Sequence, residues 1–421
     1  MKILNTSRIL ILLFSNFLHP SLFAQDGLFA PKKNTPILKA PEPKNLQDAK
    51  KLFVSNYVDI ARATHESSLN QAIVLEKSIK AFLRSPSKET HRLAKISWIQ
   101  ARFPYLQGEV FRNLGLSPSD KTNTISTLNG WPIKAGIIDY TVDDPISGIV
   151  PNSKNYPKID KNLILQVNKD ADKFVILSGY HVIEFLLWGE DNQIDGSGDR
   201  PFADYDQSQN PLAKRRASYL MNSVELLVNE LGEEVAEWKE GDDNNLLGQI
   251  NKMPLNDSIA IILKSVKKLS DSLSSKQIDS LLAENAEFIE QSSFSDSTHF
   301  DFLHSAAGIS NLFAGAYVGL DGKLKVLGLG LIGLAEKIPE TESSELRSLI
   351  NSVMRNAQAF KGPFDAFVIA SLILSAVTSL FGTKVKSINE TFGVGTLIAV
   401  PSNFPFKLGK TKLIALAAPV E

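Results

Sequence analysis

A histidine and a glutamate three residues apart stand inside a strongly apolar stretch of this sequence. His181 and Glu184 lie within the run Gly179–Trp188, and Ser178 precedes His181 by the same spacing. On a helix of 3.6 residues per turn, residues at i and i+3 share one face. The apolar run predicts a buried helix, where a carboxylate needs a proton, a cation or a hydrogen-bond donor. Two interpretations follow: half of a metal site, or a His–Glu hydrogen bond that joins two helices.

A second set of polar and aromatic residues lies on the helix predicted over residues 88–114, which Pro104 should kink. Five of them recur at steps of three and four residues along one stripe: Trp98, Arg102, Tyr105, Glu109 and Arg112. A stripe that packs into a core is usually aliphatic. This one is either a solvated face that carries aromatic residues or a functional face, and the cost of exposing Trp and Tyr favours the second.

The composition excludes several kinds of partner and ligand. The chain has 421 residues, 22% of them charged, and a formal net charge of -1. This balance provides no basic surface for nucleic acid. The sequence contains no cysteine, which excludes disulfides, thiolate ligands and a lipid anchor on Cys. Any metal would be held by histidine, carboxylate or other oxygen ligands.

The beginning of the chain has the features of a secretory signal. Lys2 and Arg8 precede and flank an apolar segment, and residues 22–24 resemble a cleavage site. We therefore expect residues 1–24 to be a signal peptide and residues 25–44 a flexible leader rich in Pro and Lys. The apolar core is short for a membrane span, so the mature protein should have none; an uncleaved anchor is the alternative.

Helical periodicity recurs along the rest of the chain, and almost no segment alternates like a strand. We predict an all-α protein of two helical bundles, residues 45–243 and 244–421, with a boundary at the polar run 241–245. Besides the helix that carries His181, we expect helices near residues 45–61, 69–82, 88–114, 214–238, 256–273, 275–289, 301–320, 323–337, 341–359 and 363–381.

These elements together resemble the imelysin family, also called the insulin-cleaving or iron-regulated periplasmic proteins. The hallmark Gly-x-His-x-x-Glu of that family is present as Gly179, His181 and Glu184. Further matching elements extend along most of the mature chain: Ala101-Arg102, Tyr105, Glu109 and Phe111-Arg112; Asn129, Trp131 and Pro132; Ile138-Asp139-Tyr140; Asp204-Tyr205; Arg215-Arg216; Phe294-Ser295, Thr298 and Asp301; and Gly308-Ile309 with Asn311. Two positions depart from the pattern: Lys134 replaces a common acidic residue, and Phe313 replaces a usual Tyr.

The resemblance implies two α-helical bundles with the hallmark residues near their interface, export from the cell, and a link to iron or other metal uptake. It suggests a metal site with His181, Glu184 and Glu109 as ligands for a divalent or trivalent ion, first of all iron or zinc. Other residues would orient these ligands or line the cleft between the bundles: Arg102, Tyr105, Trp131, Asp139, Ser178, Ser295 and Asp301. Ser295 is alternatively the cap of the following helix.

Three functions remain open. The first is a metal-binding protein of the bacterial periplasm, outer membrane or cell surface, serving iron acquisition with other components of an uptake system. The second is a metallopeptidase, which is the label of the family, with Glu184 as its catalytic residue. Its constellation is incomplete, because neither His-Glu-x-x-His nor the inverted arrangement occurs. The third is a module that binds a peptide, a glycan or a partner protein.

The other histidines of the mature chain match no element of the family and are expected to be surface or capping residues: His65, His91, His299 and His304.

Overall fold

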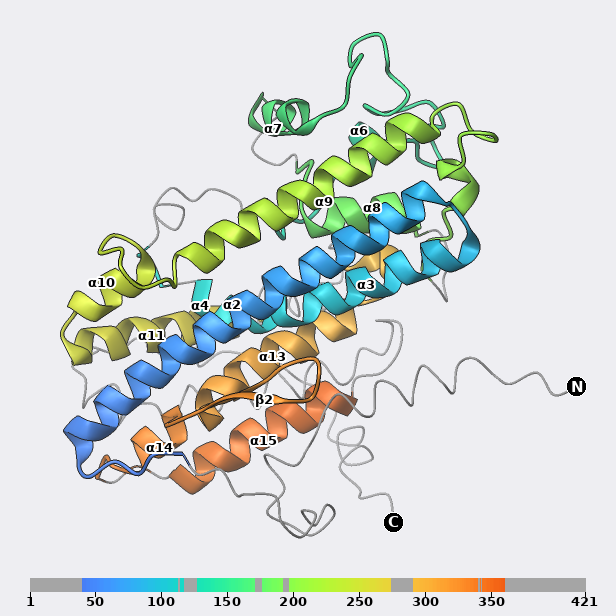
Figure 1. Cartoon of the computed structure of the whole chain (residues 1–421). Coiled ribbons are helices and arrows are strands. Elements are labelled where there is room, and N and C mark those ends of the chain that lie inside the picture. Colours follow the sequence, from blue (N-terminus) through green and yellow to red (C-terminus); the bar gives the residue numbers. More distant parts are fainter. Residues whose placement is uncertain are drawn as a thin grey trace, which may run out of the picture.

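In the residues that it describes, the computed structural model is helical apart from one short hairpin, which confirms the all-α prediction (Figure 1). It describes residues 40–112, 114–116, 127–170, 176–191, 197–273, 291–339, 341 and 343–359. In these residues no helix combines the length and the apolar character needed to cross a membrane. The predicted signal peptide, residues 25–39 of the predicted leader, and the helices predicted over 275–289 and 363–381 lie outside the described residues.

The helices and strands follow in chain order. The helices are α2 (Leu46–Arg84), α3 (Lys88–Gln107), α4 (Glu109–Arg112), α6 (Ala135–Ile138), α7 (Lys161–Asp170), α8 (Tyr180–Trp188), α9 (Ala213–Ala236), α10 (Leu246–Lys252), α11 (Leu255–Asp271), α13 (Thr298–Ala314), α14 (Leu331–Ala335) and α15 (Ser343–Ala359). The described residues also form two 3-10 turns, η2 (Phe202–Tyr205) and η4 (Ser293–Ser295), and two strands, β1 (Ala316–Val318) and β2 (Leu324–Leu327).

One long helix, α2, runs along the length of the molecule between α9 and α3 (Figure 1). The periodicity predicts two helices over this range, and the structure corrects this to one. No Gly or Pro occurs between residues 61 and 69, so nothing in the backbone interrupts the helix there. At its start, Asn45 Oδ1 accepts a hydrogen bond from the Asp48 amide at 2.9 Å, which is the expected cap. At the start of the next helix, α3, Ser87 and Thr90 form a capping box.

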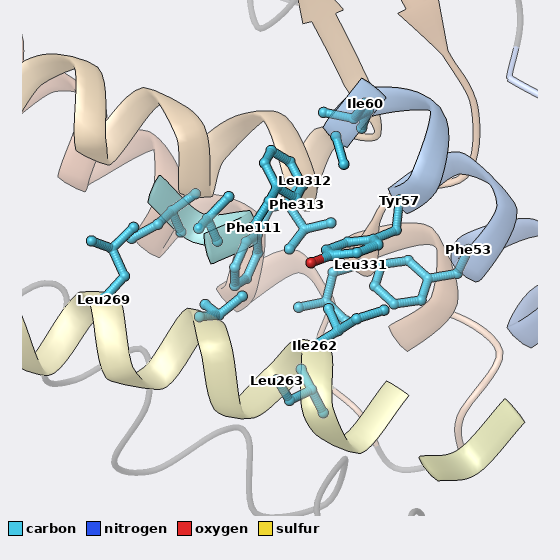
Figure 2. Close-up of a cluster of buried hydrophobic side chains, with 14 of the residues drawn as sticks. Phe53, Tyr57, Ile60, Phe111, Ile262, Leu263, Leu269, Leu312, Phe313 and Leu331 are labelled. Carbon is cyan, nitrogen blue, oxygen red and sulfur yellow. The ribbon is translucent and has the colours of Figure 1, made fainter. Parts of the chain in front are cut away.

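The buried side chains form two clusters, and α2 contributes to both. Figure 2 shows the cluster in which the first half of α2 meets α4, α11, α13 and α14. Its labelled members are Phe53, Tyr57, Ile60, Phe111, Ile262, Leu263, Leu269, Leu312, Phe313 and Leu331. The other cluster packs the second half of α2 against α3, α8 and α9. The division of the chain at residues 243 and 244 stays a prediction, since α2 spans both clusters.

A β-hairpin replaces part of the helices predicted over 301–320 and 323–337. After α13 the chain forms β1, which pairs antiparallel with β2. Gly315 ends α13 with a φ of 76°, and Gly322 lies in the hairpin turn with a φ of 70°. Both values belong to the left-handed region that glycine adopts readily. The helix predictions are wrong here because these glycines end one helix and turn the chain before another can form.

Three of the histidines expected to be surface or capping residues are buried: His65, His91 and His304. His65 Nδ1 lies 2.7 Å from the Ala61 carbonyl oxygen, and His91 Nε2 lies 2.7 Å from the Leu187 carbonyl oxygen. Burial lowers the pKa of each of these two to about 4, and the next contributions come from Arg112 for His65 and from Lys95 for His91. Both rings are therefore neutral donors at neutral pH.

These two histidines should make the protein less stable in mild acid. An unfolded histidine titrates near pH 6.5, so the unfolded chain binds more protons than the folded chain between about pH 6.5 and pH 4. The stabilisation is complete above that window and is lost as the pH falls through it, by about 2 kcal/mol per histidine at pH 5. Urea unfolding at pH 7.5 and pH 5 measures the loss. His91→Gln keeps a donor for the Leu187 carbonyl but cannot titrate. Between pH 7.5 and pH 5 the variant should therefore lose about 2 kcal/mol less unfolding free energy than the wild type. An unchanged pH dependence in that variant would contradict the assignment.

Candidate functional site

The site begins where α8 starts, at a position that requires glycine. Gly179 has a φ of 93°, and a Cβ atom there would lie 1.9 Å from the carbonyl oxygen of Thr127. The Tyr180 amide donates to the Leu128 carbonyl at 2.9 Å. This close backbone approach fixes the loop that carries Asn129 against the first turn of α8.

His181 and Glu184 meet on one face of α8, as their spacing predicts. Both side chains are 0% exposed, and His181 Nδ1 lies 2.8 Å from Glu184 Oε2. Glu184 Oε1 accepts two hydrogen bonds from Ser295 of η4, one from the backbone N–H at 2.9 Å and one from Oγ at 2.6 Å. Ser295 therefore closes this face of α8, while Ser297 takes the cap position of α13. The contact joins two segments that are 111 residues apart in the chain.

Asn129 occupies the other side of the His181 ring. Its Oδ1 lies 3.0 Å from His181 Nε2 and also accepts a hydrogen bond from Arg102 Nη1. Its Nδ2 donates to Glu109 Oε1 at 3.4 Å. Arg102 in turn donates to Asp301 Oδ1 from Nη2 at 2.7 Å and from Nε at 3.2 Å. Side chains from α3, α4, α8, α13 and two turns thus form one buried polar network.

The donors and acceptors of the network determine where its protons lie. A guanidinium only donates, so the Asn129 atom that faces Arg102 is the oxygen. Because this oxygen also faces His181 Nε2, that nitrogen carries the N–H. The other nitrogen of a neutral imidazole is an acceptor, so Glu184 Oε2 donates to it as a carboxylic acid. The remaining oxygen of Glu184 accepts both bonds from Ser295.

The electrostatics of the site favour the same protonation. Burial, followed by the charge of Arg102, lowers the pKa of His181 well below its ordinary value. Burial raises the pKa of Glu184 well above its ordinary value, against the hydrogen bond from Ser295. Desolvation disfavours the charged form of each group, which favours a neutral acid beside a neutral imidazole.

The stripe on α3 and α4 is buried in this region, so the interpretation as a solvated face is wrong. Trp98, Arg102 and Tyr105 are at most 2% exposed. The predicted single helix is interrupted after Gln107, three residues beyond Pro104, and α4 continues the stripe. There Arg112 lies 4.0 Å from the Tyr105 ring centre and pairs with Glu234 through two hydrogen bonds of 2.7 Å.

The remaining predicted site residues divide into two groups. Trp131 packs beside the site with its ring 4.9 Å from the His181 ring, and Tyr105 packs at 4.9 Å from the Tyr180 ring. Ser178 lies outside this contact, and its Oγ accepts a hydrogen bond from Asn168 Nδ2 at 2.9 Å. Asp139 also lies in a different cluster.

Comparison with known proteins assigns the family. The model of the Imelysin family, a family that carries a peptidase name, matches residues 61–378. The chain belongs to the imelysin family. Among solved structures, one described as an iron-regulated protein A precursor from Parabacteroides distasonis aligns with a TM-score of 0.60 at 18% identity, covering 83% of this chain and 96% of that one. An imelysin-like protein from Psychrobacter arcticum aligns with a TM-score of 0.57 at 10% identity, covering 85% and 98%. At these identities both show the shared fold. No curated protein matches the sequence.

In this imelysin-family chain, Asp139 belongs to a separate buried charge cluster behind α8. Its carboxylate pairs with Arg200 Nη1 at 2.9 Å and with Arg216 Nε at 2.5 Å, and all three side chains are at most 1% exposed. Asp204 is the second acid of the cluster, at 3.3 Å from Arg200. The Arg200 guanidinium lies 5.1 Å from the Phe185 ring centre. The cluster therefore packs against α8 at Phe185, and its charged groups do not contact His181.

Three residues of the network were given no role on the sequence evidence. Asn129 carries the central amide, Ser292 Oγ donates to Asp301 Oδ2 at 2.5 Å, and Ser305 Oγ donates to Glu109 Oε2 at 2.7 Å. Only Asn129 had a usable signal, because it stands two residues before Trp131 in a loop that matches the family. The two serines have no sequence pattern that separates them from others of the chain.

The donor chemistry suits a metal ion, although the closed network does not present it as a metal site. In the described residues no three His, Asp or Glu side chains converge in a way that could hold a metal. Each proposed ligand is hydrogen-bonded within the protein, and Asn129 links Glu109 to His181. An imidazole nitrogen and a carboxylate nevertheless flank a single side chain, and both are common ligands of iron and zinc.

Proposed function

We propose that this imelysin-family protein is an exported binding protein of an iron-linked uptake system, and that it takes a metal ion between His181 and Glu109. The observation that carries the proposal is that both side chains contact the same residue, Asn129, from opposite sides of its amide. The link to iron is supported by the similar structure described as an iron-regulated protein. Export is supported by the signal-like residues 1–24.

In this proposal the two residues of the His–Glu pair have different roles. His181 would bind the ion through Nε2, and Glu109 would bind it through its carboxylate. Glu184, predicted as a direct ligand, would instead orient the imidazole by its contact with Nδ1. Carboxylates in that position fix the tautomer and the direction of metal-binding histidines. The ion is the cargo of the protein and takes part in no proposed reaction.

The charges around the site support a cation as the ligand. The one buried guanidinium of the network, Arg102, is matched by Asp301, and their side chains are 2% and 4% exposed. The Glu109 carboxylate accepts hydrogen bonds from Ser305 Oγ at 2.7 Å and from Asn129 Nδ2 at 3.4 Å. Burial raises its pKa against the hydrogen bond from Ser305, and a bound cation would offset the cost of holding it ionised.

Calorimetry on the mature protein, first stripped of metal with a chelator, tests the proposal. We expect one Zn²⁺ per chain, and one Fe²⁺ per chain under anaerobic conditions. Glu109→Gln and His181→Ala should each weaken binding at least tenfold. His91→Gln, at a buried histidine outside the network, is the matched control and should bind as the wild type does. If neither ion binds stoichiometrically, or if binding survives in Glu109→Gln and His181→Ala, the proposed site is wrong.

Assays on the mature protein, with and without metal, distinguish the alternative functions. A metallopeptidase would hydrolyse a peptide substrate, and a chelator and Glu184→Gln would each abolish that hydrolysis. The hydrogen bonds on both Glu184 oxygens do not present a free base, so we expect no chelator-sensitive hydrolysis. A peptide- or glycan-binding module would retain its ligand after metal removal.

A further inference from the structure

We propose that Asn129 is the gate of the site, and that a cation binds only after the side chain of Asn129 has turned away. This inference rests on the proposed cation site between His181 and Glu109. In the closed arrangement the Asn129 amide stands between the two proposed ligands. The His181 nitrogen that would bind the ion points its proton at Asn129 Oδ1, and a protonated ring nitrogen has no lone pair to offer. Binding therefore releases the Nε2 proton to solvent, while the proton of Glu184 Oε2 moves to His181 Nδ1, 2.8 Å away.

The gate is held shut mainly by Arg102. The guanidinium donates to Asn129 Oδ1, and such charge-assisted hydrogen bonds are stronger than neutral ones. The bond from Asn129 Nδ2 to Glu109 is long at 3.4 Å and adds less. When the gate opens, Arg102 keeps both of its hydrogen bonds to Asp301, so the buried guanidinium stays neutralised.

Opening should involve the side chain and leave the backbone in place. The loop is fixed to α8 by the hydrogen bond from the Tyr180 amide to Leu128 and by the close contact at Gly179. At Gly130, a Cβ atom would lie 2.6 Å from Ile176 Cδ1, so this part of the loop is also tightly packed. Asn129 itself is only partly buried, so the proposed movement is a rotation of its side chain toward solvent.

A gate of this kind has a measurable signature. If the open form is a minor state of about 1–10% of the molecules, the apparent affinity is lower than the intrinsic affinity by that fraction. The observed binding rate should then level off at high metal concentration, where opening limits it. Asn129→Ala removes the gate and should tighten apparent binding about ten- to hundredfold. It should also restore a rate that rises linearly with metal concentration.

Stopped-flow mixing with Co²⁺ tests this, with tryptophan quenching as the signal, because the Trp131 ring is 4.9 Å from the His181 ring. Wild type, Asn129→Ala, Asn129→Ser and Asn311→Ala are compared after a thermal melt confirms that each is folded. Asn311 donates to Gln107 at 3.0 Å outside the network, so Asn311→Ala is the matched control and should keep the plateau of the wild type. Asn129→Ser supplies the test if Asn129→Ala does not fold.

The outcomes separate the gate from the site. A plateau in wild type and Asn311→Ala that disappears in the Asn129 variants, with tighter binding, supports the gate. Weaker binding in the Asn129 variants would show that Asn129 is itself a ligand and would overturn the gate alone. Unchanged rates in these variants, with metal still bound, would also overturn the gate alone. If no chain binds Co²⁺, the cation site and its gate both fail.

Discussion

Replacing Asp139 by asparagine is expected to lower the free energy of unfolding by about 3–5 kcal/mol. Asp139 is fully buried and compensates two buried arginines, Arg200 and Arg216. The variant would leave these guanidiniums with Asp204 as their remaining carboxylate. Urea unfolding followed by circular dichroism measures the loss. Asp243→Asn is the control: its ion pair with Lys252 is exposed, at 82% and 56% for the two side chains, and its midpoint should match the wild type.

A double variant tests whether this loss comes from the charge cluster. Asp139→Asn combined with Arg216→Gln removes one acid and one base together. If the two residues interact directly, the double variant should be more stable than the sum of the single losses predicts. Strictly additive losses, or a loss below about 1 kcal/mol for Asp139→Asn alone, would contradict the role assigned to the cluster.

Replacing Glu184 by alanine is the second change with a large expected effect, about 3–5 kcal/mol of unfolding free energy. It would empty buried space on α8 and remove the partners of His181 Nδ1 and of two donors on Ser295. Glu184→Gln should cost no more than about 1 kcal/mol. The glutamine amide can donate to His181 as the carboxylic acid does, while its oxygen accepts from Ser295.

This pair of variants reports the protonation of Glu184 directly. If Glu184 were ionised against an imidazolium, glutamine would remove a buried charge pair and should destabilise nearly as much as alanine. Nitrogen chemical shifts of His181 give an independent reading, because a neutral ring with its proton on Nε2 differs from an imidazolium. An imidazolium signature at neutral pH would refute the neutral network.

The sequence predicted those parts of the fold and site that depend on local spacing. The i, i+3 step brings His181 to Glu184, and the stripe of Trp98, Arg102 and Tyr105 lies on one buried face. These contacts follow from helical periodicity alone. The alternative of a His–Glu hydrogen bond is present in the structure, and it links α8 to η4 through Ser295.

The parts that were missed depend on contacts between distant segments. Asn129 reaches His181 because Gly179 lets two backbones approach closely, and no periodicity reports such an approach. Asp139 stands in a matching element of the family, yet its carboxylate turns to Arg216, which is 77 residues further along the chain. His65 and His91 appear polar in the sequence, whereas each satisfies a backbone carbonyl within the core.

The most direct test of the account is a crystal of the mature protein soaked with Zn²⁺, with anomalous data collected at the zinc edge. We predict one strong peak bonded to His181 Nε2 and to the Glu109 carboxylate, with Glu184 still on His181 Nδ1 and the Asn129 side chain turned away. The proposed site would be contradicted if zinc binds only elsewhere, or does not bind, and if Asn129 still contacts His181 and Arg102.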